Sequence, residues 1–117
     1  MMEDGRIRRV KFLDEKLYRA YLKLKGGKEE EKQLAENMDR AVLALKEDHE
    51  AGIHIPRNRW PKYYRSKFGI TNLWKYDLPK AWRLVYTITG DQIEVISIIL
   101  EWFDHKEYNK RFGYKVG

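Results

Sequence analysis

The chain has no cysteine and no long apolar run, and each absence excludes a class of protein. Without cysteine there is no disulfide bond, no thiolate metal site and no cysteine nucleophile. The most apolar stretch, residues 93–100, is far too short to span a bilayer, and no signal peptide is visible. We therefore expect a cytoplasmic protein that does not enter a membrane.

The sequence also lacks the usual marks of metal and cofactor chemistry. His49 and His54 stand apart from any second ligand at the spacing that metal sites use. Neither a glycine-rich phosphate loop nor a Ser-His-Asp arrangement is visible. We therefore expect no metal site and no cofactor.

Length and charge indicate one basic domain. The 117 residues suffice for a single domain, residues 1–117, with one modest core, and a hydrophobic content of 43% argues against disorder. Lys and Arg number 24 against 18 Asp and Glu, a net charge of +6. This excess favours an anionic partner, either a nucleic acid or an acidic protein segment, although many basic domains bind no nucleic acid.

The pattern of residues 72–102 predicts three consecutive strands. Apolar and polar side chains alternate over residues 73–78 and again over residues 82–88, with a Pro-Lys break between them. A Gly-Asp pair at 90–91 then predicts a tight hairpin turn. The β-branched residues 93–100 are typical of a strand covered on both faces, so we expect them near the centre of the sheet.

The residues before this sheet predict one strand and two helices. Residues 6–12 alternate basic and apolar side chains, which indicates a short strand at a sheet edge. Asp14 can cap a helix that ends at Gly26, and a longer amphipathic helix covers residues 28–49 and stops by Gly52. We expect the two helices to form an antiparallel pair that covers one face of the sheet.

The C-terminal residues predict a short helix over residues 105–112. Asp104 and Glu107 resemble a capping box, and Gly113 is a natural stop. Helical periods thus precede residue 52 and strand periods follow residue 72. The prediction is an α+β domain with two N-terminal helices packed on one face of a small twisted antiparallel sheet, followed by this short helix.

Residues 51–71 are open to two interpretations. Pro56 and Pro61 prevent a continuous helix. Basic side chains attract phosphates and flat rings stack on unpaired bases, so the segment is a candidate RNA surface. Alternatively, it is a loop whose rings pack beneath it while its charges are solvated. The residues in question are Arg57, Arg59, Lys62, Arg65 and Lys67 among Trp60, Tyr63, Tyr64 and Phe68.

Two segments carry a resemblance to a known family. These are LWKYDLPKAWRLVYTI at residues 73–88, with WRLVY at its centre, and DHKEY at residues 104–108. Together with the element order they resemble the RelE/ParE toxin superfamily. The resemblance implies a RelE-like toxin of a type II toxin-antitoxin system, a metal-independent endoribonuclease that cleaves mRNA on the ribosome. It also implies a small acidic antitoxin as partner and a monomeric toxin within that complex.

The resemblance implies roles for four residues. Arg83 matches the arginine of the family's strand motif and would balance charge on the phosphorane. His105 and Tyr108 would transfer protons, and Glu101 is an alternative base. Further phosphate contacts would come from Arg65, Lys67, Lys75 and Lys62. The chain departs from the family pattern because no arginine lies between Ile99 and Tyr108.

A plainer interpretation stands beside each role. Arg83 is alternatively a surface arginine paired with Asp77 or Glu101, and Glu101 a charge at a strand end. His105 is alternatively an exposed residue at a helix start, and Tyr108 a ring packed on the next turn. On that basis the function has two alternatives, a ParE-like non-enzymatic inhibitor of a protein such as gyrase, and a decayed toxin acting as an RNA-binding or regulatory module.

Overall fold

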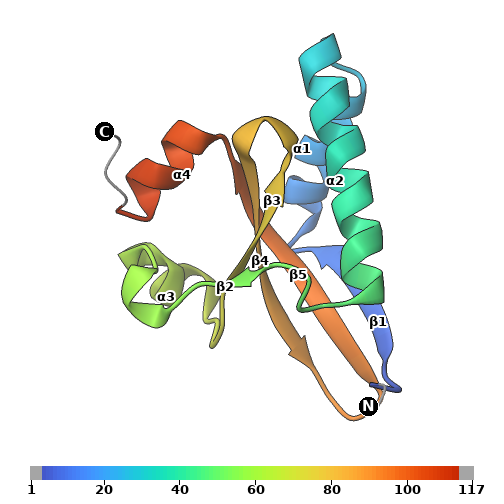
Figure 1. The fold of residues 1–117 in the computed structure, drawn as a ribbon, viewed down its shortest axis with the longest axis vertical. Helices are drawn as coiled ribbons and strands as arrows, with labels where there is room; N and C mark the ends of the chain where they lie inside the picture. The colour runs from blue at the N-terminus through green and yellow to red at the C-terminus, as the bar shows by residue number, and fades with distance from the viewer. Residues whose placement is uncertain (1–3, 114–117) are drawn as a thin grey trace.

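The structure, a computed structural model, describes residues 4–113 and shows an α+β fold (Figure 1). Its strands form one five-stranded sheet in the order β1-β5-β4-β3-β2. The elements in chain order are β1 (Ile7–Phe12), α1 (Glu15–Lys25), α2 (Glu29–Glu47), β2 (Ile53–His54), the 3-10 turn η1 (Arg57–Arg59), α3 (Lys62–Phe68), β3 (Trp74–Leu78), the 3-10 turn η2 (Pro79–Ala81), β4 (Trp82–Gly90), β5 (Glu94–Phe103) and α4 (His105–Arg111).

The sheet is mixed, because β1 pairs with β5 in parallel while the other pairs are antiparallel. The prediction of a purely antiparallel sheet is therefore wrong at one edge. The chain leaves β1 through α1 and α2 and reaches β5, the neighbour of β1 in the sheet, only after β4. This long crossover connection permits a parallel pair. The predicted positions of β1 at the edge and of β5 inside the sheet are confirmed.

One face of the sheet, here the first face, is covered by α1 and α2 (Figure 1). Asp14 caps α1 by accepting from the Leu17 amide over 2.8 Å, and Gly26 ends that helix. Spacings of three and four residues place one stripe of α2 in the core. The buried set is Tyr21, Leu34, Ala35, Met38, Ala41 and Leu45 against Leu78, Leu84, Tyr86 and Ile99. The prediction of two N-terminal helices on one face is confirmed.

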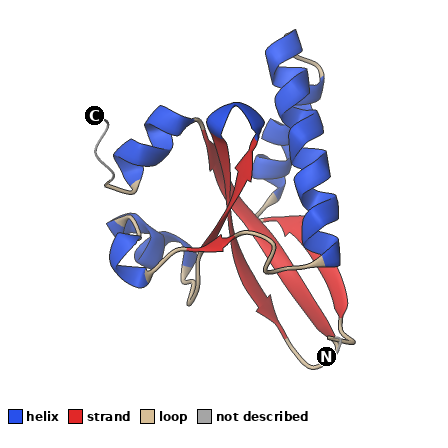
Figure 2. Cartoon of the chain, in the orientation of Figure 1, coloured by secondary structure: helices blue, strands red, loops and turns tan. Residues whose placement is uncertain are grey.

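The opposite face, here the second face, is covered by α3 and α4, so the expectation that helices cover only one side is wrong (Figure 2). Alternation along β4 explains why both faces are buried, since Leu84 and Tyr86 point to the first face and Val85 to the second. The second core contains Ile55, Tyr64, Leu73, Val85, Leu100, Phe103, Tyr108 and Phe112.

The segment expected to be a loop contains α3. Pro61 precedes its first residue, where the missing N–H of proline costs nothing, and Gly69 ends it with a φ of 60°. The two prolines do prevent a continuous helix, but they leave room for these seven residues. Its aromatic rings pack beneath it, because Tyr64 is fully buried and Trp60, Tyr63 and Phe68 are half-buried against the second core.

The loop after α2 begins slightly earlier than predicted, because the helix ends at Glu47 and not at His49. Gly52 has another role, at the point where the chain passes close to the sheet. A Cβ there would clash with the Lys75 carbonyl oxygen and come within 2.6 Å of the Tyr86 hydroxyl. That hydroxyl accepts from the Gly52 amide over 3.1 Å and donates to the His49 carbonyl over 2.9 Å. Burial raises the pKa of Tyr86 to about 12, so the hydroxyl stays protonated.

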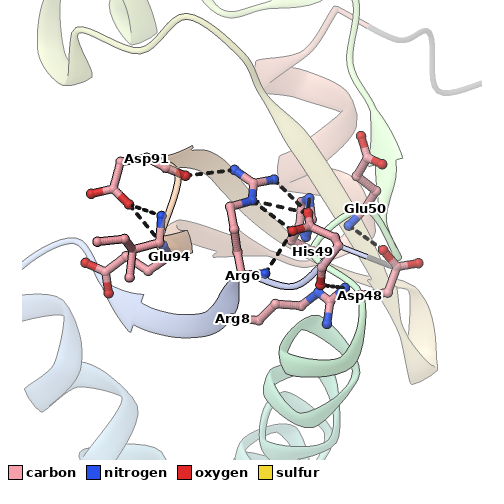
Figure 3. A network of polar contacts seen from close by, with 9 residues as sticks. Arg6, Arg8, Asp48, His49, Glu50, Asp91 and Glu94 are labelled. Atoms are coloured by element: carbon pink, nitrogen blue, oxygen red, sulfur yellow. Dashed lines mark hydrogen bonds and ion pairs between the residues drawn. The ribbon is translucent and has the colours of Figure 1, made fainter. Parts of the chain in front are cut away.

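A polar network ties the start of β1 to the β4–β5 hairpin and to the end of α2 (Figure 3). Arg6 donates to the two carboxylate oxygens of Asp4 over 2.7 and 2.9 Å, and to the Asp91 carbonyl over 3.3 Å. His49 lies 4.0 Å from the same Asp4 carboxylate. The hydrogen bonds from Arg6 hold the pKa of Asp4 well below its usual range. Asp91 also closes the predicted hairpin turn by accepting from two backbone amides.

Candidate functional site

A β-bulge decides which side chains of β5 reach the second face. Tyr86 pairs with Ile99, but the preceding residue Val85 pairs with Glu101, so Leu100 is an extra residue in β5. Because side chains alternate along a strand, Glu101 would share the first face with Ile99 if the pairing were regular. The bulge therefore places Glu101 on the second face, beneath α3 and α4.

Three charged side chains from β3 and β4 converge on this face, and we call them the Arg83 cluster: Lys75, Asp77 and Arg83. Asp77 pairs directly with Arg83 across the two antiparallel strands, and Lys75 lies two residues before Asp77 on the same face. The Lys75 ammonium donates to Asp77 Oδ1 over 2.7 Å, and Arg83 Nε lies 3.1 Å from that same oxygen. Two cations thus share one carboxylate oxygen.

The ring of Tyr108 brings α4 against this cluster. The Lys75 ammonium and the Arg83 guanidinium each lie 5.8 Å from the centre of the ring, within range of cation–π attraction. Tyr108 is only 3% exposed, and its ring stacks on Phe112 at 4.4 Å. The structure therefore joins Arg83 to Tyr108 and also shows the packing contact that the plainer interpretation expected.

A second group of charges, here the Glu101 cluster, joins α3, α4 and β5: Tyr63, Glu101, Glu107 and Arg111. Tyr63 donates to Glu101 over 3.1 Å and accepts from Arg111 over 2.8 Å, and Arg111 donates to Glu107 over 2.7 Å. Arg111 also lies 4.0 Å from Glu101 and 4.9 Å from the ring of Phe103. The hydrogen bond to Glu107 raises the pKa of Arg111, and burial raises that of Tyr63. The contacts of Glu101 are therefore made here and not with Arg83.

His105 is exposed at the first position of α4, as its plainer interpretation expected. Asp104 caps this helix by accepting from the Glu107 amide over 2.8 Å, which confirms the predicted helix start. The imidazole lies 3.3 Å from the side-chain amide of Asn109, one turn further on. The backbone of His105 nevertheless lies close to the Arg83 cluster, because Phe103, two residues before His105, is the cross-strand partner of Arg83.

The remaining predicted RNA-binding residues, Lys62, Arg65 and Lys67, are exposed on α3. The Lys67 ammonium lies 5.3 Å from the ring of Phe68, whereas Lys75 belongs to the Arg83 cluster. Tyr64 lies beneath α3, where burial and the nearby charge of Glu101 raise its pKa strongly. This helix offers cations to solvent, while its buried ring at Tyr64 cannot stack on a base.

Sequence reasoning missed the parts played by Tyr63 and Arg111, and it left the partner of Arg83 open between Asp77 and Glu101. The resemblance directs attention to an arginine before Tyr108, whereas Arg111 follows it by one helical turn. Its i, i+4 spacing from Glu107 was a usable signal for a position on α4. The sequence offered two carboxylates, Asp77 and Glu101, as partners of Arg83. Only the register between β3 and β4 shows that Asp77 is the partner.

The first face has a hollow of about 530 Å³ between the helical pair and η2, and it contains none of the predicted site residues. Its walls include Leu24, Leu34, Trp82 and Trp102. Among residues 4–113, no group of three or more His, Asp or Glu side chains is placed to hold a metal ion. Across the same residues, no helix is long and apolar enough to cross a membrane.

Comparison of the chain with protein-family models, with curated proteins and with solved structures found no match. The resemblance to the RelE/ParE superfamily therefore stays a prediction. What the second face does has to be judged from the chemistry of its own residues.

Proposed function

We propose that the second face binds RNA and cleaves it without a metal, and that the protein is a RelE-like toxin. One observation supports this above the others: Lys75 and Arg83 converge on a single carboxylate oxygen, that of Asp77. Two cations from adjacent strands, fixed on one oxygen beside an aromatic ring, are also the arrangement that a phosphate oxygen would need. The RelE-like fold assignment is part of the same proposal.

The Arg83 cluster supplies the charge that such a reaction needs. In metal-free cleavage the 2′-hydroxyl attacks the adjacent phosphorus, and negative charge grows on the pentavalent intermediate. Asp77 faces Arg83 Nε, and the Trp82 carbonyl accepts from Nη1 over 3.3 Å. A guanidinium has five N–H donors, so donors remain for the non-bridging oxygens. The buried ring of Tyr108 helps to hold Lys75 and Arg83 in position, because both cations lie within range of cation–π attraction.

His105 is the group we assign to proton transfer. It is exposed, and it starts α4 two residues after the cross-strand partner of Arg83. A neutral imidazole can accept the proton of the 2′-hydroxyl as the new P–O bond forms. The 5′-oxygen that leaves takes a proton from solvent, and the product ends in a 2′,3′-cyclic phosphate. Glu101 has a positioning role, since it ties α3 and α4 to the sheet through Tyr63 and Arg111.

The wider context follows from charge and from the resemblance. Lys62 and Arg65 are exposed on α3, where they can contact phosphates on either side of the scissile one. A net charge of +6 favours both mRNA on the ribosome and a small acidic antitoxin. We propose a monomeric cytoplasmic toxin that this antitoxin covers and neutralises.

The test is cleavage of free mRNA with EDTA present, and of mRNA on ribosomes in a magnesium buffer. Arg83→Ala should lower the rate by about 10²–10³-fold, the loss typical of one donor to developing charge. Arg9→Ala is the matched control, because Arg9 is an exposed strand arginine that pairs with Glu94 over 2.7 Å. RNA that stays intact with wild type and with Arg83→Ala alike would favour the ParE-like or the decayed-toxin alternative.

A further inference from the structure

We propose that Asp77 determines which anion the Arg83 cluster accepts, because its charge weakens the binding of a doubly charged terminal phosphate more than that of a singly charged phosphodiester. The proposal rests on the proposed function for its substrate, an RNA chain, but it concerns the binding step alone. It assigns Asp77 a specificity role that neither Lys75 nor Arg83 has.

The geometry makes the Asp77 carboxylate a built-in competitor for the two cations. Its Oδ1 atom lies 2.7 Å from the Lys75 ammonium and 3.1 Å from Arg83 Nε. The first contact is a charge-assisted hydrogen bond and the second is an ion pair, and a phosphate oxygen would seek the same two cations. An anion that enters the cluster therefore has to displace this oxygen or share the cations with it.

The charge count shows which anion fits. Lys75 and Arg83 contribute +2 and Asp77 contributes −1, so the cluster carries +1. Glu101 belongs to the Glu101 cluster, where it lies 4.0 Å from Arg111. A phosphodiester carries one negative charge, whereas a terminal phosphate approaches two at neutral pH. Repulsion from Asp77 scales with the charge of the ligand, so it weakens terminal phosphate about twice as much in free energy.

The Asp77 side chain is 45% exposed, whereas Lys75 and Arg83 are 17% and 21% exposed. Removing the carboxylate leaves two largely buried cations side by side, so the urea midpoint of each variant is measured together with its binding. Asparagine keeps its shape and removes only its charge. In Asp77→Asn the cluster carries +2, so the repulsion that Asp77 exerts on an entering anion is removed.

The experiment is an NMR titration of the full chain with dimethyl phosphate, a monoanion, and with methyl phosphate at pH 8, a dianion. The signals of the Arg83 Nε–H and of the backbone of β3 report binding. Asp77→Asn should tighten dimethyl phosphate about tenfold and methyl phosphate about a hundredfold, roughly tenfold for each charge on the ligand. The ratio of the two affinities should thus shift about tenfold toward the monoester.

The matched control is Asp39→Asn. The Asp39 side chain is also 45% exposed and also pairs with a lysine, Lys25, at 3.6 Å, but it lies on α2. This variant loses the same charge and should leave the ratio of the two affinities unchanged. Equal tightening of both ligands in Asp77→Asn, or no tightening, would overturn the proposal. If the ratio shifts and RNA stays intact in cleavage assays, then Asp77 selects anions as proposed and the nuclease function alone fails.

Discussion

Asp77 Oδ1 lies 3.1 Å from Arg83 Nε, across two paired strands, while the same guanidinium lies 5.8 Å from the ring of Tyr108. The two interpretations of Arg83, a surface ion pair and a functional cation, therefore describe one arrangement. A carboxylate and a ring hold the guanidinium in place, and 21% of the Arg83 side chain is exposed. A cation held in this way needs little reorganisation when charge develops next to it.

Proton transfer is predicted to depend on His105 and not on the hydroxyl of Tyr108. His105→Ala should lower RNA cleavage by about 10²–10⁴-fold, the range for a general acid or base. Tyr108→Phe should change it by less than about threefold, because the ring remains beside Lys75 and Arg83. Rates with EDTA present measure both, with His54→Ala as the control for loss of an exposed histidine. The reverse order of effects would assign proton transfer to Tyr108.

The Tyr86 hydroxyl is predicted to stabilise the loop after α2. Tyr86→Phe leaves the Gly52 amide and the His49 carbonyl without their partner, which should lower the free energy of unfolding by about 1–3 kcal/mol. Urea denaturation measures this difference. Tyr18→Phe changes an exposed tyrosine on α1 and should stay within about 0.5 kcal/mol of wild type. Equal stability of the two variants would mean that water replaces the lost hydroxyl.

Acid should remove the contribution of Asp4 to stability. Its folded pKa is lowered by Arg6, so its ionised form stabilises the fold above the usual pKa of about 3.9. This contribution is lost as pH falls through the lowered folded value. Wild type should therefore exceed Asp4→Asn in urea midpoint at pH 7, and the gap should narrow from about pH 5 to pH 2. A gap that widens with acid would contradict the network in Figure 3.

The local patterns predicted much of the fold, since alternation in WRLVY and the cap at Asp14 depend only on neighbouring residues. Three features depend on contacts between distant segments and were missed. The bulge at Leu100 that turns Glu101 to the second face arises from pairing with β4. The helix α3 is short, and packing of Tyr64 against the sheet supports it. The parallel pairing of the edge strand β1 depends on β5, which lies far from β1 in the sequence.

The sequence predicted which residues belong to the candidate site better than it predicted which of them contact one another. Strand alternation and the resemblance indicated Arg83 and Tyr108, and these two residues do meet. Glu101 and His105 were expected beside them, but one belongs to the Glu101 cluster and the other faces solvent. The direction of α4 as it leaves β5 decides these contacts. That direction is set by packing of Tyr108 and Phe112 and leaves no local trace in the sequence.

The central claim, metal-free cleavage through the 2′-hydroxyl, is tested most directly by the ends of the products. An RNA is mapped for its main cleavage position with EDTA present, and the same RNA is then made with a single 2′-deoxy nucleotide on the 5′ side of that position. We predict 2′,3′-cyclic or 3′-phosphate ends on the all-ribose substrate and no cut at the deoxy position, with cleavage elsewhere unchanged. A cut at the deoxy position, or products with 3′-hydroxyl ends, would contradict the mechanism.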